Sequence, residues 1–294
     1  MSLLVSMPAK ACSTTRIREV VGPERPELGL SHIYLGFVGL GRGERRGFDF
    51  GPLDTIAVVM AGSVEAAWED GLGRTHREIV EGPDDVFDGP PRAICVRPYT
   101  TLFVTGLSTS VEVALIRAEL VAESAAAWHR GEAETEAEDD AERLPEPGAE
   151  LAATRGGLAG ARTTIRLIAH VERAAVRLLV GWALIGAGSA DRIVSAGADL
   201  TREEVWHFRT RPELGAVHQR VYSPLHNRDE IHLVRHGDTV AIPPGFGAET
   251  PATGASPVTA PAPDCDVYCL WAQAQAQAGG VSTLLGDRRR GLPQ

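Results

Sequence analysis

The sequence predicts an all-β protein, in which many short strands are joined by turns and helices are few and short. Its 294 residues include 32 glycines and 19 prolines, and aromatic residues make up only 5%. Short stretches that alternate apolar and polar residues recur along the chain. This two-residue period is that of a strand with one buried face. Strands of this length, separated by turn residues, favour a sandwich or a small barrel.

The first 118 residues contain one series of predicted strands. After an extended lead-in over residues 1–30, which includes a strand and turn at Arg16–Pro23, the stretch His32–Val38 alternates. The run Thr55–Met60 is wholly apolar, which predicts a strand covered on both faces. A turn follows at Val86–Pro91. The other predicted strands of this series are Ser63–Trp68, Ala93–Val96, Leu102–Thr105 and Val111–Arg117.

Residues 119–152 interrupt this pattern. The stretch Glu132–Glu142 packs seven acids into eleven residues, and like charges three and four apart oppose a helix. We predict a solvated acidic linker, with an interaction tail as the alternative. Strands restart at Thr163–Leu167 and Arg177–Leu184. The chain is therefore predicted to form two barrel domains, 1–118 and 153–294, joined by the linker 119–152.

A motif near the end of the second series connects the chain to a known fold. Gly237, Pro243 and Gly245 form the pattern Gly-x5-Pro-x-Gly, which is similar to the second half of the cupin signature. Further stretches with a similar match are Met1–Val5, Val86–Pro91, Arg155–Arg162, Glu203–Arg209, Gln219–Tyr222, Asp229–Glu230 and the whole of Gly237–Gly245. Through these stretches the chain resembles the 5-deoxyglucuronate isomerase and 5-keto-4-deoxyuronate isomerase family over nearly its whole length. The resemblance implies a bicupin of two double-stranded β-helix (jelly-roll) barrels.

The resemblance also implies a divalent metal, held in the C-terminal barrel by three histidines and one glutamate. The family's Pro-Pro-His-x-His-Asp run falls on Val194–Asp199, so two histidine positions are occupied by Ala196 and Ala198. The last histidine, which follows Pro-x-Gly-aromatic, falls on Gly247. Glu204 alone matches a ligand. Alanine and glycine have no ligand atoms in their side chains, so we expect no metal and no other cofactor.

The surviving carboxylate is the best candidate for chemistry. Loss of three imidazoles predicts a roomier pocket with Glu204 at its base, where an apolar barrel would raise its pKa and favour proton transfer. Arg220 and Tyr222 are expected to lie nearby and to orient a substrate anion or enolate, so these three residues are the predicted catalytic set. The alternative is that Glu204 only pairs with Arg220 as a buried remnant. The predicted substrate-binding residues are Ala196, Ala198, Trp206, His218 and Gly247.

Other metal-binding residue types fit structural roles better. Strand alternation places Glu204 and His207 on opposite faces, so His207 should point away from the site. A relocated metal site of His218, His232 and Glu204 is a weaker alternative. Cys265, Val267, Cys269 and Trp271 share one face, which indicates core packing rather than a pair of soft metal ligands.

Three functions are consistent with these residues. The first is a repurposed, metal-independent acid–base enzyme, catalysing isomerisation or cyclisation of a larger small-molecule substrate, as in natural-product biosynthesis. The second is a non-catalytic bicupin that binds a small molecule. The third is a true sugar-acid aldose–ketose isomerase of inositol catabolism with a rebuilt site.

Composition excludes several other classes of partner. The formal charge is 29 − 39 = −10, which repels phosphate backbones, so nucleic acid is not expected as a partner. The sequence has no apolar run of the ~18 residues that a membrane span needs, and no secretion signal at its start. Four cysteines without a CxxC pair indicate reduced thiols and a cytoplasmic location. A small-molecule substrate is the expected partner, and a homo-oligomer stays open.

Overall fold

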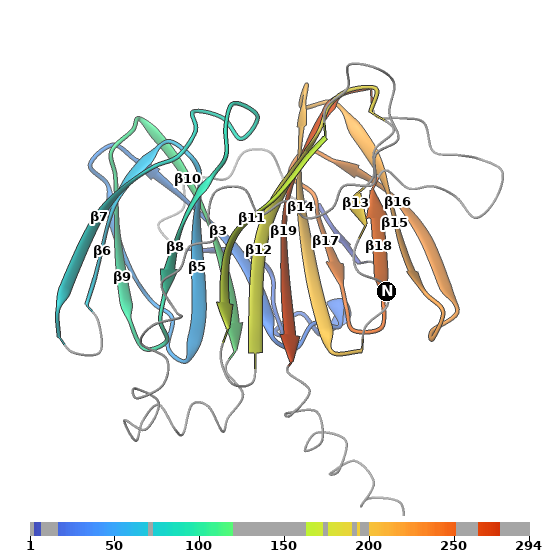
Figure 1. Ribbon diagram of the computed structural model, residues 1–294, viewed down its shortest axis with the longest axis horizontal. Helices are drawn as coiled ribbons and strands as arrows, with labels where there is room; N and C mark the ends of the chain where they lie inside the picture. Colours follow the sequence, from blue (N-terminus) through green and yellow to red (C-terminus); the bar gives the residue numbers. More distant parts are fainter. Residues whose placement is uncertain are drawn as a thin grey trace, which may run out of the picture.

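The computed structural model describes residues 3–6, 17–69, 73–119, 163–172, 176–189, 193–194, 200–250 and 264–276. Two β-barrels lie side by side, the first in blue to green and the second in yellow to red (Figure 1). The predicted all-β bicupin fold is confirmed. The acidic linker lies outside the described residues, and the domain bounds 1–118, 119–152 and 153–294 stay a prediction.

The N-terminal barrel contains nine strands and a short 3₁₀ helix among its described residues. They are β2 (Arg18–Val21), η1 (Pro26–Leu28), β3 (Ile33–Gly41), β4 (Arg45–Asp49), β5 (Leu53–Ala61), β6 (Ser63–Glu69), β7 (Thr75–Glu81), β8 (Arg92–Val96), β9 (Thr101–Gly106) and β10 (Ser110–Glu119). One antiparallel sheet has the order β2-β3-β10-β5-β8, and the other has the order β4-β9-β6-β7.

The C-terminal barrel takes one strand from the start of the chain. Its strands are β1 (Leu4–Val5), β11 (Thr163–Glu172), β12 (Val176–Ile185), β13 (Ile193–Val194), β14 (Arg202–Arg211), β15 (Ala216–Ser223), β16 (Arg228–Arg235), β17 (Thr239–Ile242), β18 (Gly247–Thr250) and β19 (Asp266–Ala276). The two sheets have the orders β1-β17-β14-β19-β12-β11 and β13-β18-β15-β16. Leu4 pairs with Val240, so the first described strand extends the C-terminal sheet.

Among the described residues, buried apolar side chains form three clusters, one inside each barrel and one between the barrels. Strand β5 contributes to two of them, because Ile56 and Val58 face the cluster between the barrels while Ala57 and Val59 face the N-terminal interior. The prediction that Thr55–Met60 forms a strand covered on both faces is therefore confirmed. In Figure 1 the sheets that contain β5 and β12 meet in the middle of the molecule.

Strand β14 joins the two barrels through the side chains of its outer face. The buried carboxylate of Glu203 accepts three backbone N–H bonds at the start of β3, from Ser31 (2.7 Å), His32 (2.9 Å) and Ile33 (3.2 Å). Further along β14, Arg209 forms an ion pair with Glu112 of β10. One face of β14 is thus committed to the interface, and the opposite face is left for the barrel interior.

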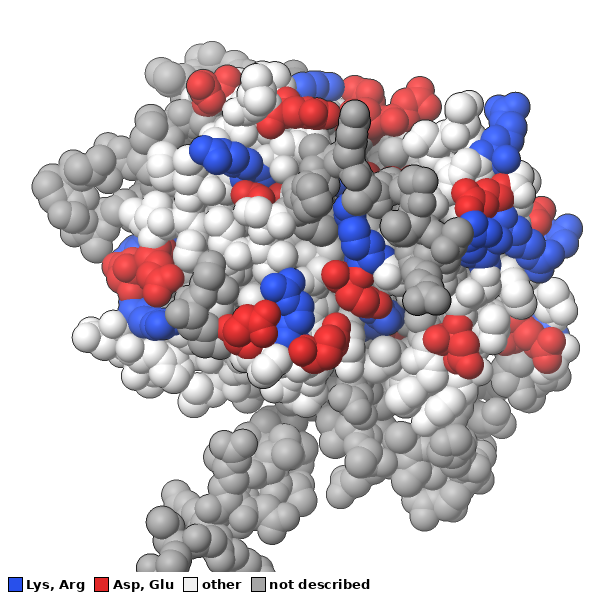
Figure 2. Space-filling model, turned by 180° about the vertical axis from the view of Figure 1, so that it is seen from behind, with Lys and Arg blue, Asp and Glu red and all other residues white. Residues whose placement is uncertain are grey.

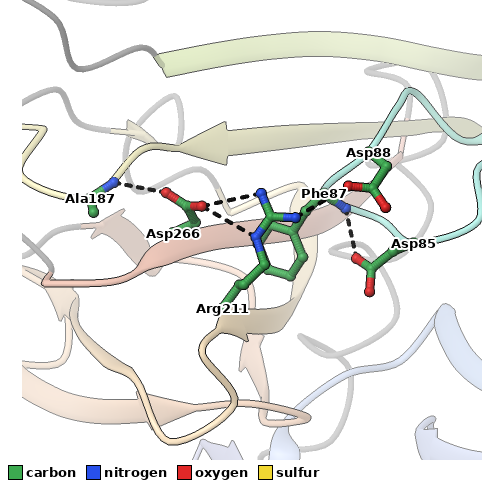
Figure 3. Close-up of polar contacts among 6 residues, drawn as sticks. All are labelled: Asp85, Phe87, Asp88, Ala187, Arg211 and Asp266. Carbon is green, nitrogen blue, oxygen red and sulfur yellow. Dashed lines mark hydrogen bonds and ion pairs between the residues drawn. The ribbon is translucent and has the colours of Figure 1, made fainter.

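Arg211 continues this contact at the end of β14. Figure 3 shows its guanidinium between Asp88 of the N-terminal barrel and Asp266 of the C-terminal barrel, at 3.2 and 3.3 Å. The same group lies 4.8 Å from the ring centroid of Phe87. Asp266 also accepts the backbone N–H of Ala187 at 3.1 Å, which connects the contact to the end of β12.

The interface is expected to lose stability at mildly acidic pH because of His207. Its ring lies 4.5 Å from that of Phe37, and burial, helped by the charge of Arg209, lowers the pKa of His207 well below 6.5. The unfolded chain takes up a proton below about pH 6.5 and the folded chain does not, so the free energy of unfolding falls as pH drops through this window toward the folded pKa. We expect this group to contribute a slope of up to ~1.4 kcal/mol per pH unit.

Urea unfolding at several pH values measures this slope. The variant His207→Gln stays neutral throughout, so its free energy of unfolding should depend less steeply on pH between about 5.5 and 6.5. Equal slopes for the two proteins would show that His207 does not titrate on unfolding.

Charges of both signs are mixed on the face of the molecule that Figure 2 shows. Figure 2 shows Asp and Glu side chains beside Lys and Arg side chains across one whole face of the molecule. Within the described part of the chain, no helix has the length and apolar character needed to cross a membrane.

Candidate functional site

The interior of the C-terminal barrel is lined by alternate residues of its strands. On β14 the inward residues include Trp206 and Phe208, and on β15 they include Val217 and Val221; all four belong to one buried cluster. Trp271 of β19 pairs with Trp206 and joins the same cluster. Along each strand, every second residue counted from these therefore faces the interior, and the residues between them face away from it.

Glu204 lies on this inner face and is only 1% exposed. The Nε atom of Arg202 lies 2.7 Å from its Oε1 atom in an ion pair, and the indole Nε1 of Trp206 donates a hydrogen bond of 3.0 Å to Oε2. Burial raises the pKa of Glu204, while Arg202, Trp206 and Gln273 oppose that rise. The result is a desolvated carboxyl group with an ion pair at Oε1 and a hydrogen bond at Oε2.

Two placements follow the strand alternation as expected. Trp206 points inward and contacts Glu204, whereas His207 points outward into the interface between the barrels. The Nδ1 atom of His207 lies 2.9 Å from the Thr239 hydroxyl. The prediction that His207 faces away from Glu204 is confirmed.

The structure does not bring Arg220 and Tyr222 to Glu204, which corrects the expected geometry. Both lie on the outer face of β15, because Val217 and Val221 occupy its inner face. Arg220 pairs with Asp229 at 2.7 and 2.8 Å and with Glu249 at 3.3 Å. The ion pair of Glu204 is made with Arg202 and not, as the remnant alternative expected, with Arg220.

The expected space at Gly247 is filled. Gly247 of β18 is the cross-strand partner of Tyr222 on the adjacent strand β15. A Cβ atom at Gly247 would lie 2.9 Å from Cζ of the Tyr222 ring. Ala248 is the inward-facing residue of β18, with no exposed surface. Gly247 therefore belongs to the outer face rather than the pocket floor. The other two lost histidine positions, Ala196 and Ala198, lie outside the described residues.

His218 shares the outer face of β15 with Arg220, so it does not join Glu204 as a substrate-binding residue, contrary to the prediction. In the described ranges, no three His, Cys, Asp or Glu side chains group closely enough to hold a metal ion. Cys265 and Cys269 are buried thiols in the interior cluster. The core role expected for both cysteines is thus confirmed.

Two polar residues that face the same interior as Glu204 were missed from the sequence, Arg202 and Gln219, and His232 was considered only as a ligand of a relocated metal site. Arg202 is two residues before Glu204 and therefore lies on the same face of the strand. Strand alternation alone could have identified it. Gln219 and His232 are cross-strand partners on the inner faces of β15 and β16. The two valines that flank Gln219 at positions 217 and 221 mark this face as the apolar one, and that pattern was readable in the sequence.

Comparison with known proteins supports this reading of the fold. The sequence matches the model of the KduI/IolB family over residues 6–257. A search of curated protein sequences finds no match. An IolB-like protein from Salmonella typhimurium LT2 is similar in structure, with a TM-score of 0.61 and 19% identity over 93% of each chain.

Oxalate decarboxylases share the same architecture. The Lactobacillus farciminis enzyme in complex with formate gives a TM-score of 0.56 at 12% identity, covering 100% of this chain and 94% of the other. A S161A mutant of the Bacillus subtilis enzyme gives 0.52 at 12% identity, covering 92% and 76%. At these identities the likeness shows a common cupin fold.

Proposed function

Since this chain belongs to the KduI/IolB family, we propose that it is an isomerase-type enzyme that transfers a proton in its C-terminal barrel without a bound metal. The observation that carries this proposal is the environment of Glu204. It is the one side chain that matches a ligand of the family, it is buried, and an arginine lies where it can neutralise the carboxylate.

The residues around Glu204 do not fit a divalent transition metal. Such an ion needs several imidazole, thiolate or carboxylate lone pairs directed at one point. The groups on the Glu204 oxygens are Arg202 and Trp206, which are hydrogen-bond donors and cannot ligate a cation. The guanidinium of Arg202 already supplies a positive charge. Ala196 and Ala198 have no side-chain atoms that could add to a ligand set.

Glu204 has the properties required to move a proton between neighbouring carbons. Its ionised carboxylate can accept the proton from the carbon beside a carbonyl, while the electrons of that C–H bond form the double bond of an enediolate and the former carbonyl oxygen takes the negative charge. The proton of the neighbouring hydroxyl then passes to that oxygen. Delivery of a proton from the Glu204 carboxyl group, which can exchange with solvent before this step, to the adjacent carbon re-forms a carbonyl one position along. A raised pKa suits both steps, because the group must hold the proton between them. Arg202 would stabilise the negative charge at each stage.

The size of the substrate and the type of reaction are also part of this proposal. The extra space for a substrate larger than that of the family would come from Ala196 and Ala198, because Tyr222 fills the space at Gly247. Isomerisation and cyclisation both begin with removal of a proton beside a carbonyl, so both stay candidates. A sugar-acid isomerase with a rebuilt metal site would need ligands beyond the described residues.

A non-catalytic binding barrel is the second candidate. It is favoured by the ion pair itself, because both oxygens of Glu204 already have partners inside the protein. A buried pair of this kind can be a structural element without chemistry.

Proton exchange in D₂O separates the two candidates. Chelator-treated protein is incubated with a panel of aldoses, ketoses and larger hydroxy-carbonyl compounds, and deuterium at the carbon beside the carbonyl is followed by NMR. An enzyme should introduce deuterium into at least one compound, and Glu204→Gln should not. Tight binding without exchange in any compound would favour the binding barrel.

A further inference from the structure

The inner face of β15 carries a buried amide that the protein itself leaves without partners. Gln219 has no exposed surface, and neither its Nε2 nor its Oε1 atom has a hydrogen-bond partner within the described structure. It lies between Val217 and Val221, whose side chains pack with Trp206 inside the barrel. A glutamine can donate two hydrogen bonds and accept two, and leaving all of them unmade in an apolar interior is costly.

Two further polar groups face the same interior without a hydrogen bond. The indole Nε1 of Trp271 is buried and unpartnered within the described residues. Its ring covers Gly181, where a Cβ atom would lie 2.0 Å from the indole Cζ2, so a close approach fixes the position of the ring. His232 is the cross-strand partner of Gln219, and its buried Nε2 atom is 3.7 Å from the Glu230 carboxylate, beyond hydrogen-bond distance.

The charges on these inner faces are already balanced. Arg202 pairs with Glu204, and Arg228 lies 3.7 Å from Glu230. His232 also lies 3.7 Å from Glu230, but burial lowers the pKa of its imidazole and so favours the uncharged form. A carboxylate ligand would add a negative charge beside two existing carboxylates and would find each described cation engaged. Burying a charge without a counter-charge is far more costly than burying a neutral hydroxyl that is hydrogen-bonded. The interior is therefore suited to an uncharged polar molecule.

We propose that the C-terminal barrel binds an uncharged polyhydroxy or hydroxy-carbonyl compound through the side chains of Gln219 and Trp271. The amide of Gln219 donates to one ligand oxygen and accepts from a ligand hydroxyl, and the indole of Trp271 donates to another oxygen. This inference rests on the proposed function only in placing the reacting carbonyl beside Glu204. It excludes a sugar acid as the preferred ligand.

Two molecules of the same shape and different charge test the proposal. D-glucuronamide is neutral and D-glucuronate is its acid, and their binding to the full chain is measured by isothermal titration calorimetry. The amide should bind at least about tenfold more tightly than the acid. A fall in affinity of about tenfold is what one mismatched buried hydrogen bond or charge is expected to cause. Tighter or equal binding of D-glucuronate, or no binding of either compound, overturns the proposal; the second outcome leaves water as the partner of Gln219.

Variants assign the binding to the named side chains. Gln219→Leu and Trp271→Phe should each weaken D-glucuronamide binding by about tenfold. The second keeps an aromatic ring while removing the indole N–H, so it tests that donor if the first folds poorly. His218→Leu is the control, because it changes the next residue of the strand on the opposite face and should leave binding within twofold. Unchanged binding in both test variants overturns the assignment.

The same measurement separates this inference from the proposed function. The affinity of Glu204→Gln for D-glucuronamide should stay within a few fold of that of the unmodified chain, since the proposed ligand contacts are made by Gln219 and Trp271 and not by Glu204. If binding depends on Gln219 while no compound undergoes proton exchange, the ligand site stands and the proposed catalysis fails. If exchange is observed but D-glucuronate is the better ligand, the proposed function stands and this inference fails.

Discussion

Replacing Glu204 by glutamine is expected to lower turnover by about 10²–10⁴-fold, the usual effect of losing a positioned acid or base. Glutamine preserves the volume of the side chain and its hydrogen bond from Trp206, and it removes the group that holds the proton. Binding should therefore stay within a few fold. The rate of deuterium incorporation into the substrate, with the fraction of folded protein checked by circular dichroism, measures the effect.

Glu249→Gln provides a matched control. Glu249 is also a mostly buried carboxylate of the C-terminal barrel, but it lies on the outer face and pairs with Arg220. Its loss should leave turnover within a few fold. A Glu204→Gln variant that retains full activity would make Glu204 a structural residue and move the chemistry elsewhere.

Replacing Glu203 by alanine should lower the free energy of unfolding by about 3–5 kcal/mol. Three backbone N–H groups at the start of β3 lose their shared acceptor. Each buried donor left without an acceptor costs roughly 1–3 kcal/mol. The N–H of Ser31, an exposed residue, can form a hydrogen bond with water instead. Urea unfolding measures the change. Glu65→Ala removes an exposed contact 3.7 Å from Arg77 and should cost less than about 1 kcal/mol. Similar losses in the two variants would mean that Glu203 does not anchor the barrels.

Much of the fold was predictable because it depends on local patterns. The apolar run of β5 indicated a strand buried on two sides, and the alternation of β14 correctly separated Glu204 from His207. The pairing of β1 with β17 was not foreseen. A two-residue strand has too short a pattern to identify, and its partner lies more than two hundred residues away.

The candidate site was predictable only in part. Glu204 and Trp206 were placed correctly, but Arg220 and Tyr222 were assigned to the interior for their chemistry, although the valines beside them mark the opposite face as the buried one. The partner of Glu204 is instead Arg202, two residues away on its own strand. The orphaned amide of Gln219 could not be inferred from sequence, because a missing partner is visible only once all neighbours are in place.

The metal content of the chain, purified without chelator and measured by inductively coupled plasma mass spectrometry, tests the proposed metal-independent site most directly. Because Arg202 and Trp206 contact the Glu204 oxygens, we expect well under one equivalent of zinc, manganese, iron or nickel, and the same low content in Glu204→Ala. One equivalent of metal per chain that disappears in Glu204→Ala would contradict this, since it would show that a rebuilt ligand set still uses Glu204.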